Sequence, residues 1–289
     1  MTRSQLAPGV EVVAVPGDRL ALRTADGAFL RVETGEADVA DLLARLAGTG
    51  PGATADADAE PELARLLEAF EAAGYLTSRA DVPPPPRAWP AHRREVLLLG
   101  DAALTEPLAA CLTTAGAAPR TGTRAELGTT RAAAVVWCLN GPVPEGLWDD
   151  ADELPARGIA WLRCHREGHQ LWLEPPAAAP GDVTSAQVRA RRLAATPAYR
   201  ELAAYWSGHR TTGAPVTLTA PAAACAAALL AADLTAWATG TTAPQPTGTL
   251  PAARRLRSLD VRTLTVSEHP VLPVPPVAAP LTAPSGERT

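Results

Sequence analysis

The chain has 289 residues, enough for two domains, and 47% of them are hydrophobic, enough to build real cores. The formal net charge is −5 and no compact stretch is strongly basic, which disfavours nucleic-acid binding through phosphate contacts. The sequence contains no run of about 18 apolar residues, and its start, MTRSQLAPGVEV, lacks the apolar segment of a signal peptide. We therefore expect a soluble, cytoplasmic protein that does not enter a membrane.

The first part of the chain, residues 1–80, has the pattern of strands followed by helices. Short apolar stretches predict three strands, and the Asp26-Gly27 pair predicts a hairpin turn before the third. The strands are expected at 10–16, 19–27 and 29–35. Apolar residues at helical spacing predict helices at 36–48, ending at Gly48, and at 61–76, and 49–60 could hold a further short helix. This order is typical of a winged-helix-like module.

A proline-rich segment, VPPPPRAWPAHRR at 82–94, follows this module. Four consecutive prolines form a stiff connector rather than a loop inside a domain, because proline fixes φ and lacks an N–H donor. We expect a linker over 81–94 and a second domain over 95–289.

The second part alternates strands and helices, which predicts an α/β fold. It opens at 95–117 with a strand, a glycine turn and a helix. The later elements are expected as a buried strand at 132–140, two strands at 159–175 joined by a Glu167-Gly168 turn, a helical stretch at 182–206 broken at Pro197, a long apolar helix at 221–240, and strands at 254–270.

The glycine turn LLLGDAAL is where a nucleotide-binding fold would place its phosphate loop. Only Gly100 of such a loop is present, and Asp101 follows it directly. A carboxylate at a helix N-terminus is a good cap but repels a phosphate. The pattern therefore favours a helix cap over ATP binding, and no cofactor is expected.

Other reactive side chains also lack the pattern of a catalytic or metal site. His165 and His169 flank a predicted turn between strands, so surface or turn histidines are expected rather than zinc ligands. The cysteines have no Cys-x-x-Cys spacing and are expected as small buried residues; they are Cys111, Cys138, Cys164 and Cys225. An acidic cluster is expected in a solvated loop; its members are Asp149, Asp150, Asp152 and Glu153. No serine has a nucleophile elbow, so the sequence predicts neither catalytic residues nor a metal site.

A binding surface is easier to find than a catalytic site. The stretch 29–35 is a candidate edge strand, and the helix at 61–74 should pack across the same sheet. An edge strand beside such a helix forms a groove in which an extended peptide can add as another strand. The expected binding residues are Phe29, Leu30, Arg31, Val32, Glu33 and Thr34 on the strand, and Leu63, Leu66, Leu67 and Phe70 on the helix. Most of this helix face must also be core, so only part of it should line the groove.

Two segments carry a resemblance over most of the first part: VPGDRLALRTADGAFLRVETGEADVADLLARLAG and ELARLLEAFEAAGYL. They resemble the PqqD-like precursor-peptide recognition elements of ribosomal natural-product pathways. The second part resembles the ThiF-like proteins of azoline and thiopeptide pathways, called Ocin-ThiF-like or TOMM leader-peptide-binding proteins. The segments that carry this second resemblance, by their order and spacing, are EVLLLGDAALTEPLAACLTTAGA, WLRCHREGHQLWLEPPAAAPGDVTSAQVRARRLAATPAYRELAAY and SLDVRTLTVSEHPVLPVPP.

The resemblance implies a winged-helix recognition module followed by a degenerate, Rossmann-type ThiF-like domain. It also implies a non-catalytic protein that binds the leader of a precursor peptide by strand addition and presents it to a separately encoded YcaO cyclodehydratase or dehydratase, which the chain is too short to contain. A homodimer is a further implication of the larger family. Two alternatives are a residual ATP-dependent adenylating enzyme and a winged-helix DNA-binding regulator. The single arginine and three glutamates of 61–74 disfavour the regulator.

The last segment, VSEHPVLPVPPVAAP, is either a disordered tail or the remnant of a metal knuckle. The resembled family usually holds one structural zinc with two Cys-x-x-Cys pairs. The positions of these pairs fall here on Thr184 or Ser185 and Gln187 or Val188, and near Val277 and Pro280, and none is cysteine. The resemblance thus implies a knuckle without its zinc. Hydrophobic packing of Val271, Leu272 and Val274 is one way to replace the stabilisation that the zinc provides.

Overall fold

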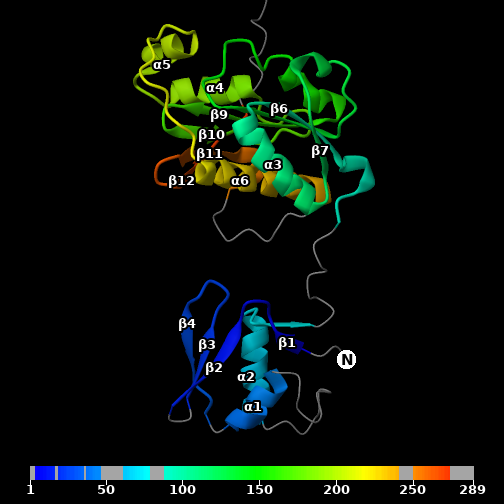
Figure 1. Cartoon of the computed structure of the whole chain (residues 1–289). Helices are drawn as coiled ribbons and strands as arrows, with labels where there is room; N and C mark the ends of the chain where they lie inside the picture. The colour runs from blue at the N-terminus through cyan, green and yellow to red at the C-terminus, as the bar shows by residue number, and fades with distance from the viewer. Residues whose placement is uncertain are drawn as a thin grey trace, which may run out of the picture. The chain divides into compact units, whose positions relative to one another are not determined.

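The computed structural model describes residues 4–16, 19–35, 37–46, 61–78, 88–240 and 250–273. The chain divides into two compact units, 1–86 and 87–289 (Figure 1). Of the predicted linker, 81–87 lie outside the described residues, whereas 88–94 belong to the second unit. Trp89 is buried in the core of that unit, and the Arg93 guanidinium donates to the Trp237 carbonyl at 2.6 Å. Trp89 and Arg93, which follow the four consecutive prolines, therefore pack against the rest of the second unit.

The first unit contains a three-stranded antiparallel sheet, a two-stranded ladder and two helices. The sheet has the order β2-β3-β4, with β2 at Glu11–Val15, β3 at Arg19–Arg23 and β4 at Phe29–Val32. The helices are α1 (Val39–Leu46) and α2 (Pro61–Ala72), and β1 (Ser4–Leu6) pairs antiparallel with β5 (Leu76–Ser78). Strands of three residues are too short for a periodic pattern, and β1 and β5 were not predicted. The predicted Gly48 stop and the segment 49–60 lie outside the described residues.

The predicted Asp26-Gly27 turn joins β3 to β4. Gly27 has φ +88°, a left-handed conformation that glycine adopts without steric cost, and its N–H donates to the Thr24 carbonyl. The sheet then packs its inner residues against both helices. The members of this core that are almost fully buried are Leu20, Leu22, Ala37, Leu42, Leu46, Leu63, Phe70 and Leu76.

The second unit is built on a seven-stranded mixed sheet, which confirms the predicted α/β class. Its order is β12-β11-β10-β9-β8-β6-β7. The parallel strands are β6 (Glu95–Gly100), β7 (Ala118–Thr121), β8 (Ala134–Leu139) and β9 (Ala160–Glu167). The antiparallel strands are β10 (Gln170–Leu173), β11 (Arg255–Asp260) and β12 (Val266–Pro270). The unpredicted β7 is an edge strand with mostly exposed residues, so it has no alternating pattern.

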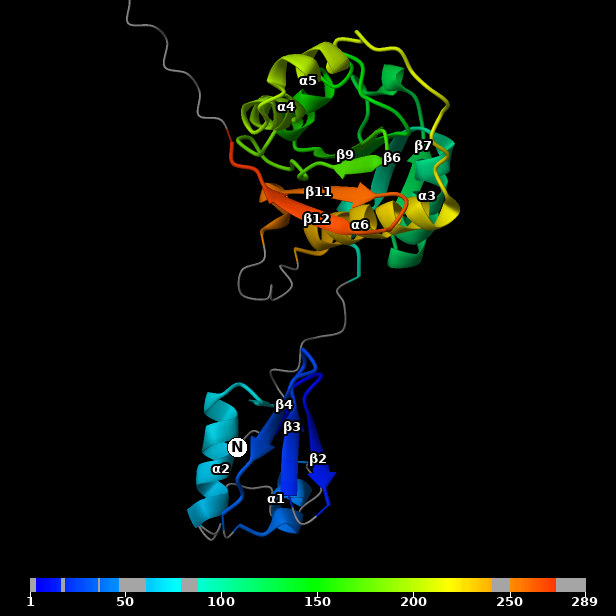
Figure 2. The same cartoon turned by 90° about the vertical axis from the view of Figure 1, so that its left-hand side faces the viewer.

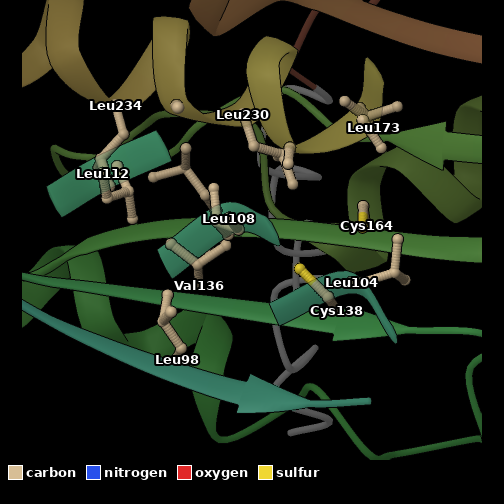
Figure 3. Packing of buried hydrophobic residues seen from close by; sticks show 14 of the residues in the cluster. Leu98, Leu104, Leu108, Leu112, Val136, Cys138, Cys164, Leu173, Leu230 and Leu234 are labelled. Atoms are coloured by element: carbon tan, nitrogen blue, oxygen red, sulfur yellow. The ribbon is translucent and has the colours of Figure 1, made fainter. Parts of the chain in front are cut away.

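Helices cover both faces of this sheet (Figures 1 and 2). One face carries α3 (Ala102–Ala115) and α6 (Ala220–Thr239), and the other carries α4 (Ser185–Ala194) and α5 (Tyr199–Trp206). Short 3-10 helices lie at Ala91–Arg93, Arg124–Glu126, Ala151–Arg157 and Ala252–Arg254. The helix α6 is long and apolar enough to cross a membrane by length and composition, but half of that span is buried in the fold. Its Leu230 and Leu234 pack with α3 on the sheet, so α6 is a core helix (Figure 3).

The end of the described chain is held against α4. Val271 is buried in one cluster with Val183, Val188 and Leu256. The Arg191 guanidinium donates to the carbonyls that follow, Leu272 at 3.1 Å and Pro273 at 3.0 Å. Leu272 itself is 63% exposed, so its predicted packing role is wrong, while Val274, Val277 and Pro280 lie outside the described residues. Thr184 and Ser185 lie where the resembled family carries its first cysteine pair. Thr184 caps α4, and the Ser185 hydroxyl donates to the Asp152 carboxylate.

Gly100 is required by close packing at the end of β6. It has φ +105°, and a Cβ at this position would overlap the Cys138 carbonyl oxygen. We expect Gly100→Ala to lower the free energy of unfolding by about 2–4 kcal/mol, from backbone strain plus overpacking. All seven tryptophans lie in the second unit, so urea unfolding followed by tryptophan fluorescence reports on it alone. Gly128→Ala is the matched control, since a Cβ there meets open space; equal losses in the two variants would contradict the expectation.

Candidate functional site

The outer edge of β4 is open among the described residues, because β4 pairs only with β3. The Thr24 N–H donates to the Ala28 carbonyl, which makes these two residues a hydrogen-bonded pair. Hydrogen-bonded and non-hydrogen-bonded pairs alternate along an antiparallel ladder. The backbone N–H and C=O groups of Phe29 and Arg31 therefore point away from β3, toward the open edge.

A cavity of about 180 Å³ lies between this edge strand and α2. Figure 2 shows α2 running beside β4. Residues of β3, β4, α2 and the segment after α2 line the cavity: Leu22, Leu30, Arg31, Val32, Ala69, Phe70 and Tyr75. The Phe70 and Tyr75 rings meet edge to face, with centroids 6.2 Å apart. The structure thus places a small, mainly apolar cavity next to unpaired backbone groups.

The predicted peptide-binding residues separate into three groups. Leu30, Arg31, Val32 and Phe70 line the cavity, and Phe29 is 63% exposed next to it on β4. Glu33 and Thr34 follow the end of β4. The other helix residues, Leu63, Leu66 and Leu67, pack into or against the core, as expected for part of that face. Three further lining residues, Leu22, Ala69 and Tyr75, were not predicted, although Leu22 is the register partner of Leu30.

At the glycine turn after β6, a hydrogen bond connects Asp101 with Asn140, the residue that follows β8. Asp101 occupies the N-cap position of α3, but its side chain makes no capping bond. Its carboxylate instead accepts from the Asn140 N–H at 2.6 Å, because the end of β8 lies directly beside it. The prediction of a side-chain cap is therefore wrong. A carboxylate at the mouth of this turn would repel a phosphate.

Two other predictions are corrected in the second unit. His165 is 4% exposed, because β9 is a central strand covered on both faces, whereas His169 is exposed in the predicted turn. Asp152 is not a solvated loop residue: it accepts from the Ser185 N–H at 2.9 Å and the Trp161 indole at 3.1 Å. Asp149, Asp150 and Glu153 are exposed. Among the residues that the structure describes, no group of three or more His, Cys, Asp or Glu could hold a metal ion.

The cysteines are free thiols. Cys138 and Cys164 are buried on neighbouring strands, whereas Cys111 and Cys225 are half-buried. A hydrogen bond with Cys138, together with burial, raises the pKa of the Cys164 thiol well above its usual value. A thiol with a raised pKa is a poor nucleophile, so Cys164 acts as a small packing residue in the core.

No protein-family model matches the sequence, and no curated protein sequence does. Solved structures share its fold. A heterocyclase in complex with substrate and cofactor and the heterocyclase TruD each align over 94% of this chain, with a TM-score of 0.57 and 18% identity. E. coli MccB aligns over 94% of this chain and 95% of its own, with a TM-score of 0.59 and 10% identity. The chain spans 39% and 42% of the two heterocyclase chains.

The chain therefore has the α/β fold found in these heterocyclases and in MccB. At identities of 18% and below, this similarity defines the fold. The winged-helix assignment of the first unit stays a prediction.

Proposed function

We propose that this protein acts in the biosynthesis of a ribosomal peptide natural product of the azoline type, by binding the leader of the precursor peptide. The observation that carries the proposal is the open edge of β4, whose outward N–H and C=O groups lie beside the cavity lined by α2. An extended peptide can add to such an edge, with backbone bonds giving affinity and the cavity receiving one apolar side chain. The fold shared with two heterocyclases supports this assignment.

The second unit is proposed to be a non-catalytic scaffold that presents the bound peptide to a separate YcaO cyclodehydratase or dehydratase in the cytoplasm. The Asp101 carboxylate at the glycine turn supports this role, because it stands where a phosphate loop needs free N–H donors. Presentation raises the effective concentration of the core peptide at the partner enzyme. A residual adenylating enzyme would instead bind ATP, which a thermal-shift measurement with and without ATP detects.

Fluorescence polarisation with a labelled leader peptide tests the proposal. Ala69 is exposed on α2 and lines the cavity, so Ala69→Glu fills the groove without disturbing the core. We expect saturable binding to the wild type and at least about tenfold weaker binding to Ala69→Glu, since a carboxylate buried against an apolar side chain is unpaired. Ala72→Glu is the control, because Ala72 is exposed on the same helix and does not line the cavity. Absence of binding to the wild type would refute the proposed function.

A further inference from the structure

A second cavity, of about 350 Å³, lies in the second unit and is lined in part by α4 and α5. Its wall is formed by the loop after β8, the end of β9, the segment after β10, and the two helices. The aromatic part of the wall consists of Trp148, His165 and Trp206. Gly100 and the first turn of α3 do not line it, so it is separate from the glycine turn. It is also in the other unit from the proposed peptide groove.

Two side chains of this wall hold buried polar atoms without a hydrogen-bond partner among the described residues. They are the indole N–H of Trp148 and Nδ1 of His165, and Nδ1 lies 3.7 Å from the Glu174 carboxylate. Trp148 is 3% exposed and His165 is 4% exposed, and their rings meet edge to face with centroids 5.6 Å apart. A buried polar group without a hydrogen bond costs free energy, and native structures contain few of them. The Trp148 indole N–H is therefore available to a molecule that enters the cavity.

Among the described residues, one cation that lines the cavity forms no ion pair. Glu174 is paired with Arg163, at 2.7 Å, and Glu167 is paired with Arg192, at 2.6 Å. Burial tends to raise the pKa of Glu167, but hydrogen bonds from His165 and Arg192 outweigh it, so this pKa lies well below its usual range. Glu167 is therefore ionised, and its carboxylate is paired with Arg192 and accepts a hydrogen bond from the Trp206 indole.

Arg189 is the remaining cation. Its guanidinium lies 4.9 Å from the centre of the Trp206 ring and makes no hydrogen bond to another described residue. The remaining acids of the lining, Glu145 and Asp149, are exposed at the rim, where water screens them. Among the described residues, the cavity thus combines a guanidinium without an ion pair, an indole N–H without a hydrogen-bond partner, and aromatic walls.

We propose that this cavity binds a small organic carboxylate, with the carboxylate on Arg189 and the apolar body between the Trp148 and Trp206 rings. A guanidinium matches a carboxylate through two parallel N–H donors. The volume is at the lower end of the range for ligand pockets, which fits a molecule with one ring. The carboxylate can belong to a free metabolite or to the C-terminal residue of a peptide.

Isothermal titration calorimetry of the full chain with four matched probes tests this site. Phenylacetamide replaces the carboxylate of phenylacetate with a neutral amide of nearly the same shape, and N-acetyl-Gly-Phe with a free or an amidated C-terminus repeats the comparison on a peptide. We expect at least one acid to bind saturably and its amide to bind about 10- to 100-fold more weakly, because a hydrogen bond to a charged group is lost. Tighter binding of phenylacetate would point to a free molecule, and tighter binding of the acetylated dipeptide acid to a peptide terminus.

Two variants locate the binding. Arg189→Gln should weaken acid binding about tenfold or more, while Trp148→Phe keeps an aromatic ring but removes the N–H and should weaken it less. Arg200→Gln is the charge-matched control, because Arg200 is exposed on α5 and does not line the cavity. Equal binding of acid and amide, unchanged binding by Arg189→Gln, or no saturable binding of either acid would overturn the proposal. None of these results bears on the leader titration, because the groove lies in the first unit.

Discussion

Replacing Arg31 with proline is expected to weaken leader binding by about 10- to 100-fold and to leave the first unit folded. The Arg31 N–H points to the open edge of β4, so proline removes a donor that an added strand would use. The bonds between β3 and β4 are made by the alternate residues Leu30 and Val32 and remain intact. Proline is tolerated on edge strands when its nitrogen faces outward.

Arg31→Ala separates the backbone from the side chain. It keeps the N–H and removes the guanidinium, so it should bind the leader nearly as well as the wild type. Fluorescence polarisation gives the affinities, and a two-dimensional NMR spectrum of each variant shows whether the first unit is folded. Strand addition at β4 would be refuted by a folded Arg31→Pro variant that binds like the wild type.

Replacing Glu174 with alanine is expected to lower the free energy of unfolding of the second unit by about 3–5 kcal/mol. The Arg163 side chain is 0% exposed, and its Nε donates to the Glu174 carboxylate at 2.7 Å. Arg163 also donates to the Val183 carbonyl, so this pair links the central strand β9 to the segment before α4. Without the carboxylate, the buried guanidinium has no counter-charge. The expected loss of stability therefore exceeds the net contribution of the ion pair to the free energy of unfolding.

Glu174→Gln should lose less stability than Glu174→Ala, because its amide oxygen still accepts from Arg163. Glu145→Ala is the surface control, since Glu145 is exposed and forms no ion pair among the described residues. Urea unfolding monitored by tryptophan fluorescence measures all three. If Glu174→Ala lies within about 0.5 kcal/mol of the wild type, as is usual for surface changes, the pair does not stabilise the fold.

Strong local signals made several elements predictable from the sequence. The Asp26-Gly27 pair gave the β3–β4 turn, because glycine there adopts positive φ at little cost. The predominantly apolar residues of 221–240 predicted a long apolar helix, and α6 is that helix. The strand and helix that line the groove were also predicted: alternating apolar residues predicted β4, and apolar residues at helical spacing predicted α2. These features depend on residues close together in the sequence.

Features that depend on distant residues were not predictable in this way. The buried position of His165 follows from the placement of β9 between β8 and β10, which its own polar neighbours do not reveal. Asp152 contacts Ser185 only because the 3-10 helix at Ala151–Arg157 lies at the start of α4. Similarly, Tyr75 reaches the groove through its packing on Phe70. Local pattern carries no information about such contacts.

The order of elements along the chain also determines when each unit can become stable during synthesis. The first unit is complete once β5 has paired with β1, within its own 86 residues. The second unit cannot bury the α3 face of its sheet until α6 follows, more than 100 residues after α3. Its β9–β10 hairpin also waits for β11 and β12. Because domains generally fold as units from the N-terminus, the open edge of β4 exists on the nascent chain before the second unit has closed its core.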